Sequence, residues 1–225
     1  MLVKDWMSKG VITADANDSM QDAMQRMKEK GISMLPVIKK GKLVGVVTDR
    51  DLKRASASDA TTLEVHELLF LITKIKVQDI MTRNPITIPF DFTVEEAAEV
   101  LLEKNISGAP VMDEKGKVIG IITKNDLFRV LISLTGVGKR GIQFAFEVED
   151  RPGSIRELAD VIRRYGGRMV SILSTYENVR EGYRKVFIRM YGVEREQLPK
   201  LEKELGETAK YLYLVDHREN RREIF

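Results

Sequence analysis

The segment Gly45-Val-Val-Thr-Asp-Arg-Asp51 is followed 75 residues later by Gly120-Ile-Ile-Thr-Lys-Asn-Asp126. In each segment an apolar, β-branched run ends in threonine, and an aspartate follows three residues on. β-Branched runs favour strands, whereas threonine and aspartate favour the first turn of a helix. Each segment therefore predicts a strand that leads into a helix, with a hydroxyl and a carboxylate on one rim.

The sequence around these segments repeats as well. Gly31-Ile-Ser-Met-Leu-Pro-Val37 matches Asn105-Ile-Ser-Gly-Ala-Pro-Val111 at an offset of 74, and Met7 matches Met81 at the same offset. Ordered matches at one spacing indicate an internal structural repeat. We expect two copies of one unit, over residues 1–60 and 77–135, each with the order β-α-β-β-α.

Hydrophobic spacing places the elements of each copy. Extended pieces are expected at 11–13 and 85–88, and paired strands at 35–38 and 43–48 in the first copy. The first helix of copy one carries an apolar stripe at three- and four-residue spacing, typical of a core-facing helix. In copy two, Thr93 and Glu96 have the spacing of a capping box. The stripes comprise Met20, Ala23, Met24 and Met27 in copy one, and Ala97, Ala98, Leu101 and Leu102 in copy two.

Two connecting segments are predicted. Residues 61–76 are expected to form a linker helix with one apolar side, made of Leu68, Leu69, Ile72 and Ile75. His66, near its start, is interpreted as a surface or capping residue. A second connector, 136–140, is rich in glycine, which favours a flexible link. The helix before it has Leu127, Val130, Leu131 and Leu134 at helical spacing, and we expect these side chains to pack on the repeats.

The remainder of the chain follows another pattern. Apolar residues alternate from Ile142 to Val148, as in a half-buried strand, and Asp150-Arg-Pro-Gly153 then breaks the strand and opens a helix. Further strand and helix patterns complete the order βαββαβ over residues 141–216. Residues 217–225 are dense in charge and are expected to form a frayed tail.

Composition excludes several classes of protein. The chain has no cysteine and only two histidines, which excludes disulfides and cysteine chemistry and argues against a histidine-rich metal site. The longest fully apolar stretch has five residues, whereas a membrane span needs about 20. We therefore expect a soluble, cytoplasmic protein without a metal site.

The doubled pattern resembles the cystathionine-β-synthase (CBS) domain, present as a tandem pair. This resemblance implies an α+β fold in which two CBS repeats form a Bateman module. It also implies a regulatory rather than catalytic role, with an adenine nucleotide or S-adenosylmethionine bound between the repeats as a regulatory ligand and no required cofactor. Gly108 and Ala109 leave space for adenine where copy one has the bulkier Met34 and Leu35, so the copy-two site is favoured. The implied binding residues are Thr48, Arg50, Asp51, Ile86, Ser107, Gly108, Ala109, Pro110, Thr123 and Asp126.

The C-terminal pattern is similar to the ACT domain, a ferredoxin-like regulatory module. In ACT relatives the loop that matches Asp150, Arg151, Pro152 and Gly153 gives backbone amides to a ligand carboxylate. The alternative is that this loop is only a strand-to-helix turn. A CBS pair followed by an ACT domain resembles the bacterial acetoin-utilisation regulatory proteins.

Other readings remain open at this stage. The chain could be an enzyme of acetoin breakdown, although no catalytic residue is predicted. It could also bind nucleic acid through its C-terminal part, where 13 arginines occur, but 12 glutamates occur among them and the net charge of the chain is only +3. As partners we expect small-molecule effectors, an unidentified regulated protein and a second copy in a homodimer, because the edges of a four-stranded sheet invite pairing. No membrane partner is expected.

Overall fold

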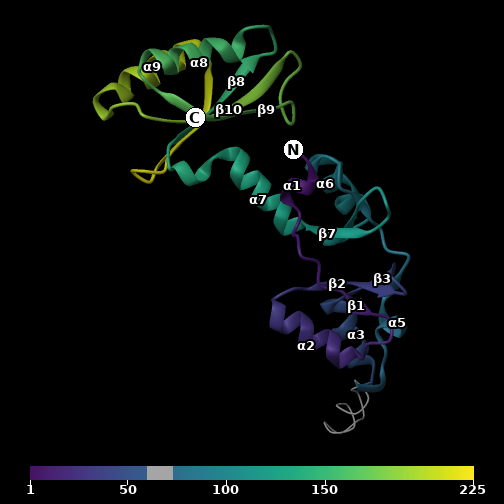
Figure 1. The fold of residues 1–225 in the computed structure, drawn as a ribbon. Helices are drawn as coiled ribbons and strands as arrows, with labels where there is room; N and C mark the ends of the chain where they lie inside the picture. Colours follow the sequence, from purple (N-terminus) through teal and green to yellow (C-terminus); the bar gives the residue numbers. More distant parts are fainter. Residues whose placement is uncertain (60–72) are drawn as a thin grey trace. The chain divides into compact units, whose positions relative to one another are not determined.

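The computed structural model describes residues 1–59 and 73–225. These residues divide into two units, Met1–Phe128 and Arg129–Phe225 (Figure 1). Most of the linker helix expected at 61–76, including His66, lies outside the described residues. No helix in the described part is long and apolar enough to cross a membrane.

The first unit contains the two predicted repeats, each with the order β-α-β-β-α after a short helix. Strand β4 is an unpredicted addition in the second repeat, and the first strand lies at Ala14–Asp15 rather than at the expected 11–13. One four-stranded sheet has the order β1-β2-β3-β4, and a three-stranded sheet has the order β5-β6-β7. Parallel pairing joins Ala14 to Val37 and, 74 residues on, Ile88 to Val111. The first repeat comprises α1 (Val3–Trp6), β1 (Ala14–Asp15), α2 (Met20–Lys30), β2 (Met34–Lys39), β3 (Lys42–Thr48) and α3 (Asp49–Asp59). The second comprises α5 (Val77–Ile80), β4 (Thr82–Arg83), β5 (Ile88–Pro89), α6 (Val94–Glu103), β6 (Gly108–Met112), β7 (Val118–Thr123) and α7 (Lys124–Thr135), a helix that begins in the first unit and ends in the second.

Helices α2 and α6 begin and pack in equivalent ways. Each starts with a capping box, Ser19 with Asp22 and Thr93 with Glu96, which confirms the box predicted for copy two. The buried positions are also equivalent at an offset of 74: Met20, Ala23 and Met27 in α2, and Val94, Ala97 and Leu101 in α6. The stripes expected from sequence were too wide, because Met24 is 39% exposed and Leu102 is 71% exposed.

The two repeats exchange their first short helices. Val3 of α1 is fully buried among residues of the second repeat, with Ile88, Leu101 and Val111. Val77 of α5 is fully buried in the core of the first repeat. Strand β4 likewise pairs with β3, and Ser8 forms two backbone hydrogen bonds with Ile121, of 2.9 and 3.1 Å. Each repeat therefore completes the core of the other.

Two glycines make this exchange possible. A Cβ atom on Gly45 would lie 2.5 Å from Sδ of Met81 and 2.9 Å from the carbonyl oxygen of Thr82. A Cβ atom on Gly120 would collide with Sδ of Met7. The methionine that follows each exchanged helix thus lies on a glycine of the other repeat.

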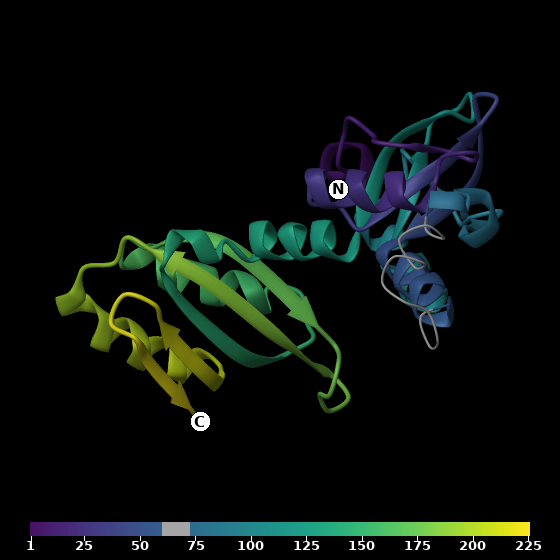
Figure 2. The same ribbon diagram turned by 90° about the horizontal axis from the view of Figure 1, so that it is seen from below.

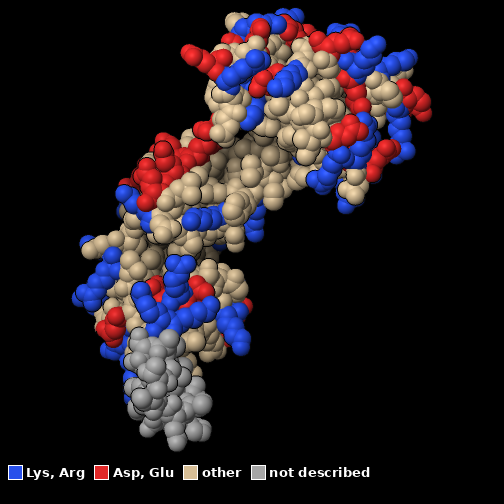
Figure 3. All heavy atoms as spheres, turned by 180° about the vertical axis from the view of Figure 1, so that it is seen from behind, with Lys and Arg blue, Asp and Glu red and all other residues tan. Residues whose placement is uncertain are grey.

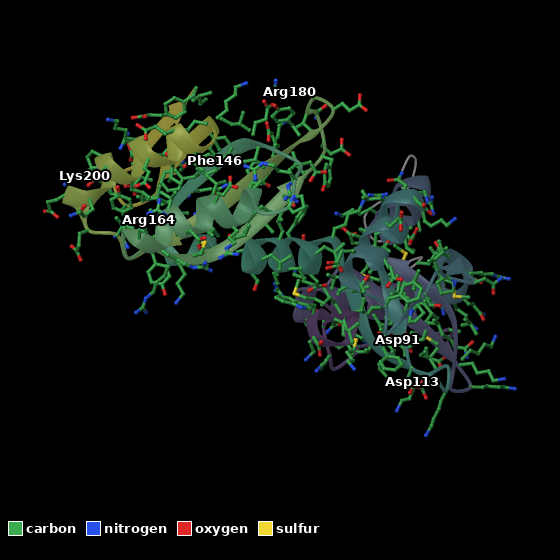
Figure 4. All side chains as sticks on the ribbon, turned by 90° about the horizontal axis from the view of Figure 1, so that it is seen from above. Asp91, Asp113, Phe146, Arg164, Arg180 and Lys200 are labelled. Carbon is green, nitrogen blue, oxygen red and sulfur yellow. The ribbon has the colours of Figure 1, made fainter. Side chains whose placement is uncertain are left out.

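The second unit is an antiparallel sheet covered by two helices on one face (Figure 2). Strands follow the order β12-β11-β8-β10-β9, so β8 and β10 are interior. Phe146 of β8 is fully buried in the core between the sheet and the helices, whereas Arg180 and Lys200 lie at the periphery (Figure 4). The elements are β8 (Ile142–Glu149), α8 (Ser154–Arg164), β9 (Arg168–Thr175), β10 (Tyr183–Tyr191), α9 (Leu198–Thr208), β11 (Lys210–Asp216) and β12 (Arg221–Ile224), with single 3-10 turns at Val137–Lys139 and Arg195–Gln197.

The expectation of a frayed tail at 217–225 was wrong. Strand β12 pairs antiparallel with β11, which satisfies backbone groups along the outer edge of that strand. Arg221 donates two hydrogen bonds of 3.0 Å to the carboxylate of Glu202 on α9. The ring of Phe225 lies 5.1 Å from that of Tyr211. The dense charge of this segment is partly paired, which the composition alone did not reveal.

The connector at 136–140 is packed rather than slack. Gly136 has a φ of +62°, and a Cβ atom on it would collide with Val170. The carbonyl oxygen of Thr135, at the end of α7, accepts hydrogen bonds from Nε of Arg189 (2.8 Å) and Oγ of Ser171 (3.0 Å). Glycine here allows close approach of the backbone to β9 instead of providing a flexible link.

The packing predicted for α7 is only partly correct. Leu127 packs against the core of the second repeat, whereas Val130 is 4% exposed but lies outside that cluster, in the second unit. Leu131 and Leu134, however, are 54% and 42% exposed. The helix therefore keeps an apolar surface that the sequence assigned to the core.

We predict that Gly45→Ala lowers the free energy of unfolding by about 1–3 kcal/mol, as expected for overpacking. Gly120→Ala should cost less, because the side chain of Met7 can move whereas the backbone oxygen of Thr82 cannot. Urea unfolding measures both. Gly138→Ala is the control, since a Cβ atom there has nothing within 4 Å. Equal stability of the Gly45 and Gly138 variants would contradict the proposed close contact.

Candidate functional site

A cavity of about 500 Å³ lies within the first unit. This volume is in the range of small-molecule sites, roughly 300–1,000 Å³. Both repeats line it: the end of β3 and the start of α3 from the first, and the segments before β5 and β6 from the second. The lining residues are Met34, Val46, Thr48, Asp49, Arg50, Asp51, Arg54, Thr82, Asn84, Pro85, Ile86, Asn105, Ile106, Ser107, Gly108, Pro110 and Lys124.

The Thr-x-x-Asp motif forms a reciprocal helix cap in both repeats. The backbone N–H and hydroxyl of Thr48 donate to Oδ2 of Asp51 at 3.0 and 2.7 Å, and the Asp51 N–H donates back to Oγ1 of Thr48. Thr123 and Asp126 form the same three hydrogen bonds. The capping role of these aspartates is therefore real. In Asp51 the cap uses Oδ2, and the other oxygen, Oδ1, can accept a further hydrogen bond besides the one from Arg54.

The structure brings most of the predicted binding residues to one cavity. Ala109, Thr123 and Asp126 are not part of the lining: Ala109 is fully buried in the core of the second repeat, and Asp126 is 3% exposed. The cavity thus combines the Thr-x-x-Asp motif of the first repeat with strand β6 of the second. The predicted residues that line it are Thr48, Arg50, Asp51, Ile86, Ser107, Gly108 and Pro110.

Gly108 also has a role in packing that the sequence did not reveal. A Cβ atom there would lie 2.9 Å from the Ile122 carbonyl oxygen and 2.9 Å from Cγ2 of Thr123. The missing side chain permits close packing of β6 on β7. Only the backbone of Gly108 is left to face the cavity.

Two lining residues that sequence reasoning missed are Asn84 and Asn105. Both have a left-handed backbone, with φ of 48° and 50°. At an offset of 74 their counterparts are Gly10 and Gly31, with φ of 73° and 63°. Asparagine tolerates this conformation better than most residues. The repeat alignment could therefore have identified both positions as turns flanking the cavity.

The charges that line the cavity are unequally compensated. The carboxylate of Asp49 accepts a hydrogen bond of 3.1 Å from Lys53, and Arg54 donates one of 3.1 Å to Asp51. The side chains of Arg50 and Lys124 make no hydrogen bond or ion pair with any other residue in 1–59 and 73–225. These two cations therefore remain available to a ligand.

The loop Asp150-Arg-Pro-Gly153, which joins β8 to α8, has its charges engaged. Arg151 donates hydrogen bonds of 2.7 and 2.8 Å to Glu157 and one of 3.2 Å to Glu149. The hydrogen bond from Arg151 lowers the pKa of Glu157 below its ordinary value. Asp150 lies 3.5 Å from Nε of Arg184. The side chain of Arg151 is therefore paired with acids of its own unit. The backbone N–H groups of Asp150 and Arg151, which the ACT resemblance assigns to a ligand carboxylate, donate to the carbonyl oxygens of Gly182 and Glu149.

Arginines elsewhere in the second unit are also paired. Arg163 donates to Asp160 at 3.0 Å, Arg164 pairs with Glu204, and Arg221 pairs with Glu202. Acidic and basic side chains are interspersed on the face drawn in Figure 3. This arrangement does not favour a surface that tracks the phosphates of a nucleic acid. Among the described residues no group of three or more histidine, aspartate or glutamate side chains is arranged to hold a metal ion.

The comparison of this chain with known protein families agrees with the internal repeat found in its sequence. The model of the CBS domain matches residues 3–58 and 77–133. The chain belongs to the CBS domain family. Its first unit therefore contains a tandem CBS pair, or Bateman module, and the cavity lies within this pair. CBS pairs are in general regulatory rather than catalytic.

Related proteins share this CBS pair. A CBS domain-containing protein of Dictyostelium discoideum is 36% identical over 135 residues, which cover 60% of this chain and 93% of the relative. The CBS domain pair of protein MJ0100, solved in complex with 5′-methylthioadenosine and S-adenosyl-L-methionine, is 36% identical with a TM-score of 0.50, covering 58% of this chain and 99% of that one. A putative acetoin utilization protein of Vibrio cholerae, 23% identical with a TM-score of 0.51 over 62% of this chain and 96% of its own, shares the fold.

We predict that Asp51→Ala and Asp126→Ala each lower the free energy of unfolding by about 1–2 kcal/mol, because each removes the acid of a helix cap. Thermal and urea unfolding without ligand measure the effect. Asn125→Ala, an exposed position in the first turn of α7, is the control. A loss no greater than that of the control would mean that the caps contribute little to stability.

Proposed function

We propose that this protein is a ligand-sensing regulator that binds an adenosine compound, either an adenine nucleotide or S-adenosylmethionine, in the cavity of its CBS pair. The observation that carries this proposal is the meeting of Thr48 and Asp51 with Ser107, Gly108 and Pro110 around one cavity. The complex of the MJ0100 CBS pair with two adenosine compounds supports the proposal.

The chemistry of the lining suits each part of adenosine. The carboxylate of Asp51 can accept hydrogen bonds from both ribose hydroxyls, a charge-assisted contact. Met34, Val46 and Ile86 offer apolar surface to the adenine ring, and backbone groups of Gly108 can hydrogen-bond to its edge. The backbone N–H groups in the first turn of α3 can donate hydrogen bonds to an anionic group of the ligand, such as a phosphate.

We predict that Asp51→Ala weakens binding of adenosine compounds roughly tenfold or more, from the loss of a contact worth about 1.5–3 kcal/mol. Calorimetric titration of the ligand-stripped full chain measures this. Asp22→Ala is the matched control, because Asp22 is also the acid of a capping box but does not line the cavity.

Asp126→Ala tests the copy-two motif that the sequence favoured, in the same titration. Stronger weakening by Asp126→Ala than by Asp51→Ala would move the ribose site to the second motif. No binding of AMP, ADP, ATP, 5′-methylthioadenosine or S-adenosylmethionine to the native chain would overturn the proposed function.

For the second unit we propose an ACT-type module that serves assembly rather than effector binding. The order βαββαβ and the strand order β11-β8-β10-β9 support a ferredoxin-like fold of this kind. Because the backbone N–H groups of Asp150 and Arg151 already donate to carbonyl oxygens of the same unit, we favour the interpretation of this loop as a strand-to-helix turn. A pathway such as acetoin use is not part of this proposal, since the acetoin-related likeness supports the fold alone.

We propose that the protein is a homodimer. Phe128, Leu131 and Ile132 lie at three- and four-residue spacing on α7 and are 60%, 54% and 56% exposed. Contiguous exposed apolar surface of this kind is typical of an interaction site. Strand β9, at the edge of the second sheet, also has no charged residue from Met169 to Thr175 to discourage pairing.

We predict a dimer by light scattering of the native chain, and a shift towards monomer in Leu131→Glu, because burying a carboxylate at an apolar interface is costly. Arg129→Glu, a charge change on the same helix at an exposed position, is the control. A native monomer at micromolar concentration would contradict the proposed homodimer.

A further inference from the structure

We propose that the cavity of the CBS pair selects adenosine 5′-phosphates over S-adenosylmethionine and 5′-methylthioadenosine. This inference rests on the proposed function, which leaves the class of adenosine compound open. It is carried by two cations, Arg50 and Lys124, that line the cavity without a partner among the described residues.

The balance of charge around the cavity favours an anion. Arg50, Arg54 and Lys124 face two acids, Asp49 and Asp51. Arg54 forms an ion pair with Asp51. Asp49 forms an ion pair with Lys53, a residue that does not line the cavity. The lining therefore carries one more positive than negative side chain, and neither acid forms an ion pair with Arg50 or Lys124.

Arg50 and Lys124 lie at the ends of helices where a positive charge lowers helix stability. Arg50 lies in the first turn of α3, and Lys124 is the first residue of α7. The positive end of a helix dipole lies at this end, where acids stabilise and bases destabilise. In the first repeat the position equivalent to Lys124 is Asp49, the residue type that the helix prefers. A ligand phosphate would compensate both cations together with the helix termini.

The candidate ligands differ most in charge. A phosphate monoester carries about −1.5 to −2 at pH 7, and each further phosphate adds negative charge. S-adenosylmethionine carries a sulfonium cation and an ammonium group against one carboxylate, and 5′-methylthioadenosine is neutral. All three share the ribose and adenine that the rest of the cavity would bind. Selection among them therefore depends on Arg50 and Lys124.

Calorimetric titration of the full chain with AMP, ADP, ATP, 5′-methylthioadenosine and S-adenosylmethionine tests this selection. We expect the phosphates to bind most tightly and S-adenosylmethionine least tightly. Arg50→Gln and Lys124→Gln should each weaken phosphate binding about tenfold or more, the loss expected for a hydrogen bond to a charged group. Neither substitution should weaken 5′-methylthioadenosine binding. Lys30→Gln, which removes one positive charge from an exposed site outside the cavity, is the control.

The outcomes separate this inference from the proposed function. Binding of 5′-methylthioadenosine or S-adenosylmethionine as tight as that of the phosphates would overturn the selection and leave the adenosine site standing. Equal weakening of phosphates and 5′-methylthioadenosine by the two variants would also overturn it. Failure of every adenosine compound to bind the native chain would instead remove the proposed function itself.

Discussion

The reciprocal packing of Met7 on Gly120 and of Met81 on Gly45 is the constraint on which the first unit depends. Each methionine follows a short helix that has left its own repeat to complete the core of the other. Neither repeat can then bury its core alone, because Val3 and Val77 are each supplied by the opposite copy. The exchange holds β3 and the start of α3 beside the segments that precede β5 and β6. The cavity between them is a consequence of this arrangement.

At the cavity the same residues stabilise the fold and offer chemistry to a ligand. Asp51 caps α3 through Thr48 and also presents its carboxylate to the cavity. Substitution of Asp51 therefore has two effects, and a capping acid remote from the cavity is needed to separate them. Arg50 and Lys124 differ from Asp51, because neither side chain forms a hydrogen bond or ion pair with the described residues. Side chains that the fold does not use are the better indicators of a ligand.

The sequence was sufficient to predict what the repeat itself encodes. The two matched segments gave the order of elements in both copies, and the Thr93–Glu96 spacing gave a helix cap. Contacts between distant segments were not accessible in this way. The exchange of α1 and α5, the pairing of β12 with β11 and the engagement of Arg151 by Glu157 all depend on tertiary structure. Hydrophobic spacing also overestimated the core at Leu131 and Leu134, because an exposed apolar stripe has the same helical period as one that faces the core. At the site, seven of the ten residues that the CBS resemblance implied line the cavity. Which repeat supplies each of them to the one cavity followed only from the fold.

A crystal structure of the full chain grown with ADP would test the central claim most directly. The account predicts one adenosine bound between Thr48–Asp51 and Ser107–Pro110, with its ribose hydroxyls on Asp51 and its phosphates facing Arg50 and Lys124. A nucleotide bound beside Thr123 and Asp126 with its phosphates away from both cations, or bound only in the second unit, would contradict it.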